Sequence, residues 1–141
     1  MALSPNKFNL TVEDWLKGVM NFGTPDVIKV MWSTVAPVAT NHVYGDLTDL
    51  ATSNGYTNGG ATCGSNTVSN ASGTESLAAT ATTWTSTTGD ISLRYLTYYD
   101  NTPATKTLLV WYDYGSTLTL HGANGDTLQA SPAGNVLLTL A

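Results

Sequence analysis

One cysteine, two histidines and few charged residues limit the chemistry open to this chain of 141 residues. Because Cys63 is the only cysteine, the chain can form no internal disulfide and no cysteine-based zinc cage. Neither His42 nor His121 has a sequence neighbour that suggests a metal pair. The chain also lacks a Gly-x-Ser-x-Gly elbow and a phosphate-binding Gly-x-x-x-x-Gly-Lys loop. We therefore expect no catalytic residue, no metal site and no cofactor.

Charge is scarce as well, at 11% of residues, and the net charge is −5. The five basic residues are spread along the chain, so a phosphate-tracking stripe is not expected and neither is nucleic acid as a partner. No apolar run approaches the roughly 18–20 residues that cross a bilayer, and residues 1–7 do not resemble a signal peptide. These patterns predict no membrane partner and synthesis in a reducing cytoplasm.

Carboxylates are the remaining source of site chemistry. Asp46 and Asp49 are three residues apart, and further aspartates fall at predicted turns or strand ends: Asp90, Asp100, Asp113 and Asp126. A loop cluster of this kind can hold calcium, although none has EF-hand spacing. A glycosidase pair drawn from distant positions also stays open as a small-hydrolase alternative.

The N-terminal segment, residues 1–24, contains the one clear helical pattern. Asn9 or Thr11 can cap a helix whose first turn carries Glu13 and Asp14. Val12, Trp15 and Leu16 follow a 3.6-residue apolar stripe that Val19 continues, and residues 23–25 predict a stop. This stripe packs either on the domain's own sheet or on a neighbouring subunit, so Val12, Trp15 and Leu16 are candidate partner-binding residues.

Residues 25–141 read as strands and turns. Val27–Trp32, Ile91–Tyr99 and Thr107–Tyr114 are the strongest strand candidates. Weaker candidates are residues 62–69, 76–84, 117–120, 127–130 and 135–140. Turns are predicted at 87–90, 115–116, 124–125 and 131–134, and a short helical turn at 46–51. About seven or eight strands at roughly 8–12-residue spacing predict a single mainly β domain over residues 1–141, an antiparallel β-sandwich or jelly-roll-like fold with one short N-terminal helix.

Aromatic residues cluster in the predicted strands. They either fill the core and its rims or line a contact surface, as tyrosine and tryptophan often do at interfaces. Tyr98, Tyr99, Tyr112 and Tyr114 are the most suggestive, and strand alternation places Tyr112 and Tyr114 on one face. We add these four to the candidate partner-binding residues.

The order of segments resembles a family of small virion structural proteins of tailed bacteriophages. The most specific segments are Asn54-Gly55-Tyr56-Thr57-Asn58-Gly59-Gly60 and Trp111-Tyr112-Asp113-Tyr114-Gly115. The resemblance spans most of the chain, through residues 6–8, 28–31, 36–41, 46–51, 54–61, 83–84, 94–95, 99–103, 111–116 and 125–127.

This resemblance implies a non-enzymatic capsid decoration or cement protein, made in the host bacterial cytoplasm and carried on the head surface of the virion. The implied partner is the major capsid protein of the same phage, together with self-association as a symmetric homo-oligomer. The family brings no catalytic residues. A tail-associated or fibre module that binds host-surface carbohydrate is the alternative, and it predicts exposed Trp or Tyr platforms.

Overall fold

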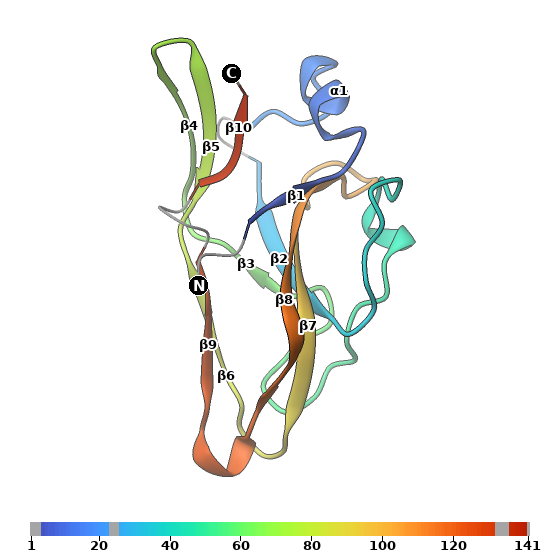
Figure 1. The fold of residues 1–141 in the computed structure, drawn as a ribbon, viewed down its shortest axis with the longest axis vertical. Coiled ribbons are helices and arrows are strands. Elements are labelled where there is room, and N and C mark those ends of the chain that lie inside the picture. The colour runs from blue at the N-terminus through green and yellow to red at the C-terminus, as the bar shows by residue number, and fades with distance from the viewer. Residues whose placement is uncertain (1–3, 23–25, 132–135, 141) are drawn as a thin grey trace.

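The computed structural model describes residues 4–22, 26–131 and 136–140 (Figure 1). The described residues form ten strands, one α-helix and two 3-10 helices. The strands are β1 (Asn6–Lys7), β2 (Ile28–Ser33), β3 (Ala61–Thr62), β4 (Asn66–Ala71), β5 (Thr74–Ala79), β6 (Thr82–Thr85), β7 (Ile91–Asp100), β8 (Leu108–Leu120), β9 (Thr127–Ala130) and β10 (Val136–Leu140). The helices are α1 (Thr11–Leu16), η1 (Tyr44–Asp46) and η2 (Gly122–Asn124). A mainly β fold with one short helix near the N-terminus is confirmed, with ten strands described where seven or eight were predicted.

The largest sheet has the strand order β1-β8-β7-β2-β3, and all its neighbours are antiparallel. Its centre is the pairing of β7 with β2 and β8, where Leu96 lies opposite both Trp32 and Tyr112. These are the segments that the sequence marks as apolar and β-branched or aromatic. The predicted strands at 27–32, 91–99 and 107–114 are therefore confirmed.

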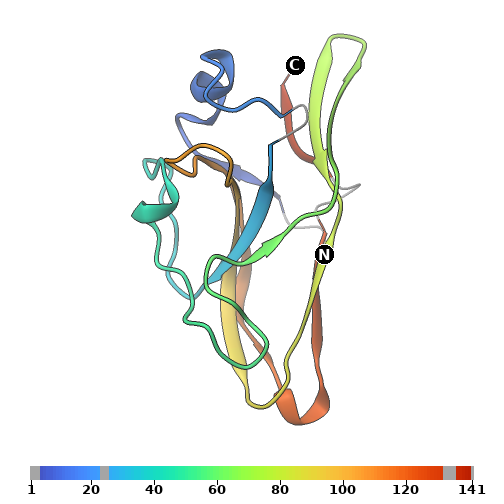
Figure 2. The same cartoon turned by 180° about the vertical axis from the view of Figure 1, so that it is seen from behind.

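Two smaller sheets lie along one face of the large sheet, as both views of the ribbon show (Figures 1 and 2). One has the order β10-β5-β4 and the other pairs β6 with β9, again antiparallel. A single hydrophobic core draws Trp32 and Tyr98 from the large sheet, Leu77 and Leu137 from the three-stranded sheet, and Trp84 from the two-stranded one. This arrangement is consistent with the predicted sandwich.

The opposite face of the large sheet is also covered. Phe8, Met31, Tyr99 and Leu108 form a second buried cluster there, and Tyr44, Leu47 and Trp111 pack against it. The ring centroids of Phe8 and Trp111 lie 4.5 Å apart. The central strands are therefore buried on both faces, which is why β8 begins with the consecutive apolar residues Leu108, Leu109 and Val110.

Strand β8 runs unbroken through the turn predicted at Gly115-Ser116. Leu118 pairs with Leu93 and Asp113 with Tyr95, so Arg94 alone on β7 stands opposite residues 114–117 of β8. Gly115 has φ +79°, which glycine adopts without strain, and the chain bulges there instead of reversing. The Arg94 guanidinium donates to both oxygens of Asp113 at 2.8 and 3.0 Å and lowers the pKa of that carboxyl.

Other local predictions shift in position. The strand predicted over 76–84 divides into β5 and β6 at residues 80–81, and the weak strand over 62–69 divides into β3 and β4. The helical turn predicted at 46–51 is wrong, because the short helix η1 lies at 44–46 instead. The turn at Asn124-Gly125 is confirmed, with Gly125 at φ +65°. The predicted helix stop at 23–25 and most of the turn at 131–134 lie outside the described residues.

Candidate functional site

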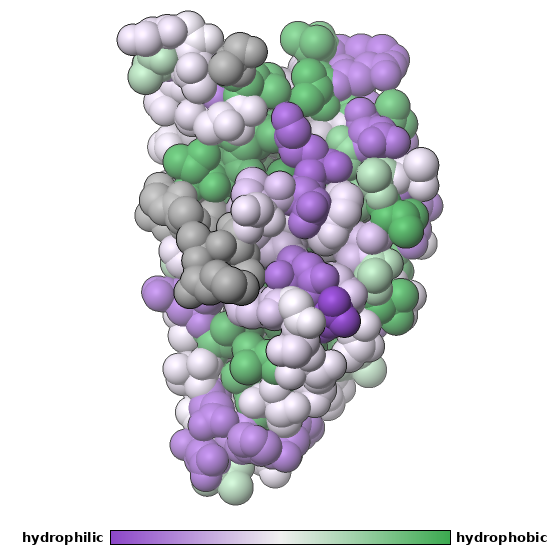
Figure 3. All heavy atoms as spheres, viewed as in Figure 1, coloured by the Kyte–Doolittle hydropathy of each residue, from purple (hydrophilic) through white to green (hydrophobic). Residues whose placement is uncertain are grey.

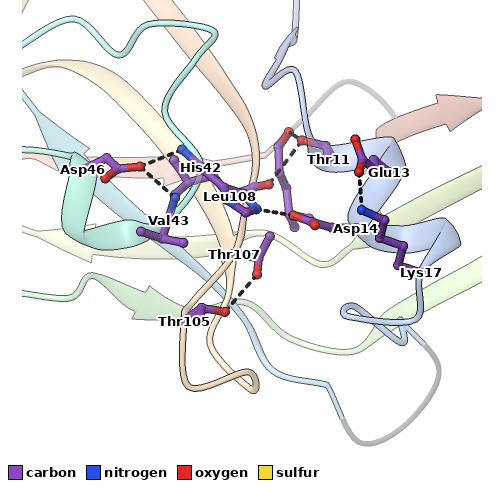
Figure 4. A network of polar contacts seen from close by, with 11 residues as sticks. Thr11, Glu13, Asp14, Lys17, His42, Val43, Asp46, Thr105, Thr107 and Leu108 are labelled. Atoms are coloured by element: carbon purple, nitrogen blue, oxygen red, sulfur yellow. Dashed lines mark hydrogen bonds and ion pairs between the residues drawn. The ribbon is translucent and has the colours of Figure 1, made fainter.

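Helix α1 is fastened to the large sheet by a polar side chain. Thr11 Oγ1 donates to the carbonyl oxygens of Leu109 at 2.9 Å and Leu108 at 3.2 Å on β8 (Figure 4). The expectation that Asn9 or Thr11 caps the helix is wrong, since no side chain bonds the first amides of α1. The hydroxyl of Thr11 therefore bonds carbonyl oxygens of β8, and it positions the helix against the sheet instead of capping its first amides.

A second polar contact holds the same face of α1. Asp14 is buried, and its Oδ2 accepts a hydrogen bond from His42 Nε2 at 2.5 Å (Figure 4). The main chain of His42 is itself fixed, because its amide donates to Asp46 Oδ2 at 2.7 Å and the amide of Val43 donates to the same atom at 3.1 Å. These two amides lower the pKa of the Asp46 carboxyl.

The inner face of α1 therefore combines the polar residues Thr11 and Asp14 with Trp15, which packs against the core, while Leu16 at the end of the helix points outward. Thr11 and Asp14 are the buried residues of the helix, whereas Leu16 is 82% exposed and Val19, just past the helix, is 43% exposed. The chain leaves the helix at Gly18, which has φ +71°. We call the exposed side chains of Leu16 and Val19 the α1 surface. Of the predicted apolar stripe, Trp15 thus faces the core in the usual amphipathic way and Leu16 does not.

The other two helix candidates are partly buried. Val12 and Trp15 have intermediate exposure, and Trp15 contacts the edge of Phe22 with ring centroids 5.2 Å apart. The exposed Glu13–Lys17 ion pair flanks the α1 surface, and the close lysine lowers the pKa of Glu13. On the face drawn in Figure 3, hydrophobic and hydrophilic residues are mixed in the upper half of the molecule, and hydrophilic residues gather at its lower end.

Three of the four candidate tyrosines belong to the core. Tyr98, Tyr99 and Tyr112 are buried, so the prediction that they line a contact surface is corrected, and Tyr114 alone is partly exposed. Strand alternation favours a free face, but β7 and the first half of β8 have both faces covered. Burial raises the pKa of Tyr99 and Tyr112 to about 12, so these hydroxyls stay neutral.

A cluster around Asp49, which the sequence does not reveal, ties the loop of residues 44–60 to the sheet. Asp49 accepts hydrogen bonds from the hydroxyls of Tyr44, at 2.7 Å, and Tyr56. Tyr56 in turn accepts the amide of Trp32 at 3.0 Å, and Tyr99 donates to the carbonyl of Gly59 at 2.7 Å. Every contact here is made to the protein's own residues, so this cluster holds the loop in place.

A buried pair of carboxyls links the segment after α1 to the end of β7. Asp100 is fully buried, and its Oδ1 accepts the amide of Thr102 at 2.9 Å. Asp26 accepts the amide of Asn21 at 2.6 Å. Burial, together with the neighbouring carboxyl of Asp26, raises the pKa of Asp100 to about 6. Asp100 Oδ2 is buried and accepts no hydrogen bond from the described residues.

The remaining reactive groups are either inert or exposed. Burial raises the pKa of the Cys63 thiol to about 12, which keeps it protonated. His121 Nδ1 lies 2.9 Å from Asp90 Oδ2 on the exposed end of the molecule near η2. A small hollow of about 40 Å³ lies between Met31, Pro37 and Leu47.

Within residues 4–22, 26–131 and 136–140, no three His, Cys, Asp or Glu side chains are grouped so that they could hold a metal ion. In the same residues, the α-helix is too short and too polar to cross a bilayer. No family model, no curated protein and no solved structure matches the chain. Among the described residues, Leu16 of the α1 surface is the most exposed large hydrophobic side chain, and this surface is the candidate site.

Proposed function

We propose that this chain is a non-enzymatic structural protein of a tailed-bacteriophage virion, a β-sandwich decoration protein that binds the assembled head. Its partner is the major capsid protein of the same phage, and it associates with itself as a symmetric homo-oligomer. A protein that binds only the assembled lattice stabilises that state by mass action. It needs a well-ordered fold and a contact surface, and it needs no catalytic group.

The two segments that carry the sequence resemblance have structural roles that suit a shared fold. Tyr56 bonds Asp49, and a Cβ at Gly60 would lie 1.9 Å from the carbonyl oxygen of Val30, so only glycine fits against β2. Asp113 and Gly115 form the β8 bulge. Such structural roles support the proposal that the resemblance reflects a shared architecture.

The α1 surface is the observation that carries the proposal. A leucine that is 82% exposed on a helix fastened by two polar contacts has a fixed position and no partner within the described chain. Covering one such side chain stabilises a complex by about 1.5–3 kcal/mol, and a shell multiplies this gain over many copies. We infer that α1 faces the capsid shell.

Binding to expanded empty capsids tests the proposal. We expect the purified protein to bind at micromolar concentration, and Leu16→Ser to weaken binding by about tenfold to a hundredfold, the equivalent of the burial energy above. Val35→Ser is the matched control, because Val35 is 52% exposed but follows β2 and is not part of α1. Absence of binding by the native chain, or equal binding by Leu16→Ser, would remove the proposal.

The carbohydrate-binding alternative depends on exposed aromatic platforms. Tyr98, Tyr99 and Tyr112 are buried, so three of the residues that suggested it are not accessible to a sugar. The capsid surface is therefore favoured. Specific binding to a glycan array would reverse this preference.

A further inference from the structure

Strand β4 is a free sheet edge. It ends the sheet β10-β5-β4 and is hydrogen-bonded to β5 alone among the described strands. With six residues it is the longest of the described edge strands, since β10 has five, β6 and β9 have four, and β1 and β3 have two. The hairpin of β4 and β5 projects from the body of the molecule, as Figures 1 and 2 show. At the first residue of β4, Asn66 Nδ2 donates to the carbonyl of Phe22 at 3.1 Å, whereas residues 67–71 are exposed and their outer N–H and C=O groups bond no other described strand.

This edge lacks the features that keep strands apart. Soluble proteins protect long edges with charges, prolines or bulges. The sequence of β4, Asn-Thr-Val-Ser-Asn-Ala, contains no charge and no proline, and its pairing with β5 continues without a register shift. The projecting hairpin is drawn in Figure 3 mostly in pale colours of intermediate hydropathy. The neighbouring charge, Glu75 on β5, accepts a hydrogen bond from Asn70 Nδ2 at 2.5 Å.

The hairpin fixes which backbone groups of β4 point outward. Ser72 and Gly73, both with positive φ, form a two-residue loop closed by the pair Ala71 and Thr74. Such loops close on a pair that exchanges hydrogen bonds, and every second pair then does the same. The amide of Thr80 donates to the carbonyl of Ser65 at 3.3 Å, which places the odd-numbered residues on the inward side of the ladder.

The outward N–H and C=O groups therefore belong to Asn66, Val68 and Asn70, which are spaced evenly around Val68. Side chains add to this pattern. Val68 pairs with Leu77 and Leu77 with Leu138, so the three share one face of the sheet. Leu77 is fully buried, whereas Val68, at the end of the row, is 41% exposed.

We propose that β4 pairs antiparallel with β4 of a second copy of this chain, about a two-fold axis that passes beside Val68. Val68 then lies opposite Val68 of the second copy, and Asn66 lies opposite Asn70. Each of these pairs exchanges two hydrogen bonds, because all their backbone groups point outward. The row of Val68, Leu77 and Leu138 continues across the axis into the second copy, and no like charges meet.

A second copy fits this edge because the edge is complementary to itself. A two-fold interface requires that residue i meets residue j and that j meets i, and the outward positions 66, 68 and 70 meet this condition without any shift. The inference gives a surface and a register to the self-association part of the proposed function. The dimer needs no capsid, so its failure and the failure of capsid binding are separate results.

Cysteine cross-linking tests the register. Across a hydrogen-bonded antiparallel pair the Cα atoms are about 5.5 Å apart, within the range of about 4.4–6.8 Å that a disulfide spans. We expect Val68→Cys to form a covalent dimer on mild oxidation. Thr67→Cys is the matched control, because two copies of position 67 lie about 8 Å apart in this register, beyond disulfide reach. Cys63 is buried, so the native chain reports any background reaction.

We expect Val68→Cys to cross-link at least about tenfold faster than Thr67→Cys, whose thiols the register keeps out of reach. Equal rates, or a faster reaction at position 67, would overturn the proposal. Amide hydrogen exchange of the unaltered chain gives a second reading that needs no variant. The amides of Asn66, Val68 and Asn70 should gain protection as protein concentration rises, and exchange that is independent of concentration would likewise overturn the pairing.

Discussion

Replacing Asp100 by asparagine removes a buried carboxyl whose ionisation costs the folded protein stability. Asp100 is fully buried beside Asp26, and the pKa of its carboxyl is raised from 3.8 to about 6 by burial and by that neighbour. In Asp100→Asn the side-chain oxygen can still accept the amide of Thr102, and the new NH₂ group can donate to Asp26. The variant therefore keeps the contacts of the pair without an ionisable group at position 100.

The sign and size of the effect follow from linkage. A carboxyl whose pKa is higher in the folded state adds stability that is fully present below about pH 4 and is lost as the pH rises through about 6. The difference between 3.8 and about 6 corresponds to at most roughly 3 kcal/mol. We expect Asp100→Asn to match the native protein near pH 4 and to exceed it by up to this amount at pH 7. For a domain near this size the gain equals roughly 6–12 °C in Tm.

Urea unfolding and thermal melts at half-unit steps from pH 4 to pH 8 measure the difference between the two proteins. Asp46→Asn serves as a control of opposite sign, because backbone amides lower the pKa of Asp46 and its ionised form stabilises the fold above the ordinary pKa. Parallel pH profiles for Asp100→Asn and the native chain would refute the reasoning. A variant that is less stable at every pH would show that an asparagine side chain does not fit beside Asp26.

Three further substitutions test the packing. Gly60→Ala should be clearly more destabilising than Gly125→Ala in urea unfolding, because both have positive φ but only a Cβ at Gly60 meets a carbonyl, at 1.9 Å; equal losses would contradict the close approach. Tyr56→Phe should cost about 1–3 kcal/mol, because the amide of Trp32 and the carboxylate of Asp49 both lose a partner; a neutral result would show that water replaces the hydroxyl. Leu77→Ala should cost about 2–5 kcal/mol by thermal or urea unfolding, and a loss below about 1 kcal/mol would place Leu77 outside the core.

The strands that the sequence predicts best are those whose signal is local. The segment at 28–33 is largely β-branched and aromatic, and the turn at Asn124-Gly125 needs only its own two residues to adopt its shape. Each of these features is decided within a few positions of the chain.

The errors arise where a distant segment decides between two local options. Gly115 suits a turn and a bulge equally well, and the pairing of Leu118 with Leu93 selects the bulge. Strand alternation predicts on which face of the sheet Tyr98 and Tyr112 lie, but not which segments cover that face. Residues of the smaller sheets and of the segment after α1 pack with both tyrosines in the core.

The polar contacts of α1 cannot be predicted from the sequence for a related reason. Asp14 meets His42 across 28 positions and Thr11 meets Leu109 across 98, so no spacing rule joins them. The 3.6-residue spacing places Leu16 on the apolar stripe of the helix. The same spacing does not say whether that stripe faces the protein or the solvent. Buried polar partners on the inner side of α1 decide that.

The fastening of α1 to β8 also sets the order in which the chain can take its final form. Thr11 bonds Leu109, and β1 pairs Asn6 with Trp111, so the first elements of the chain are held by residues made about a hundred positions later. At about 5–20 residues per second, ribosomal synthesis separates these partners by roughly 5–20 s. A truncated or half-made chain therefore has no β8 to hold α1 in place. Leu16 is synthesised early, but it takes its final position only after β8 has been made. A lattice that binds through Leu16 would therefore bind fully folded chains and not incomplete ones.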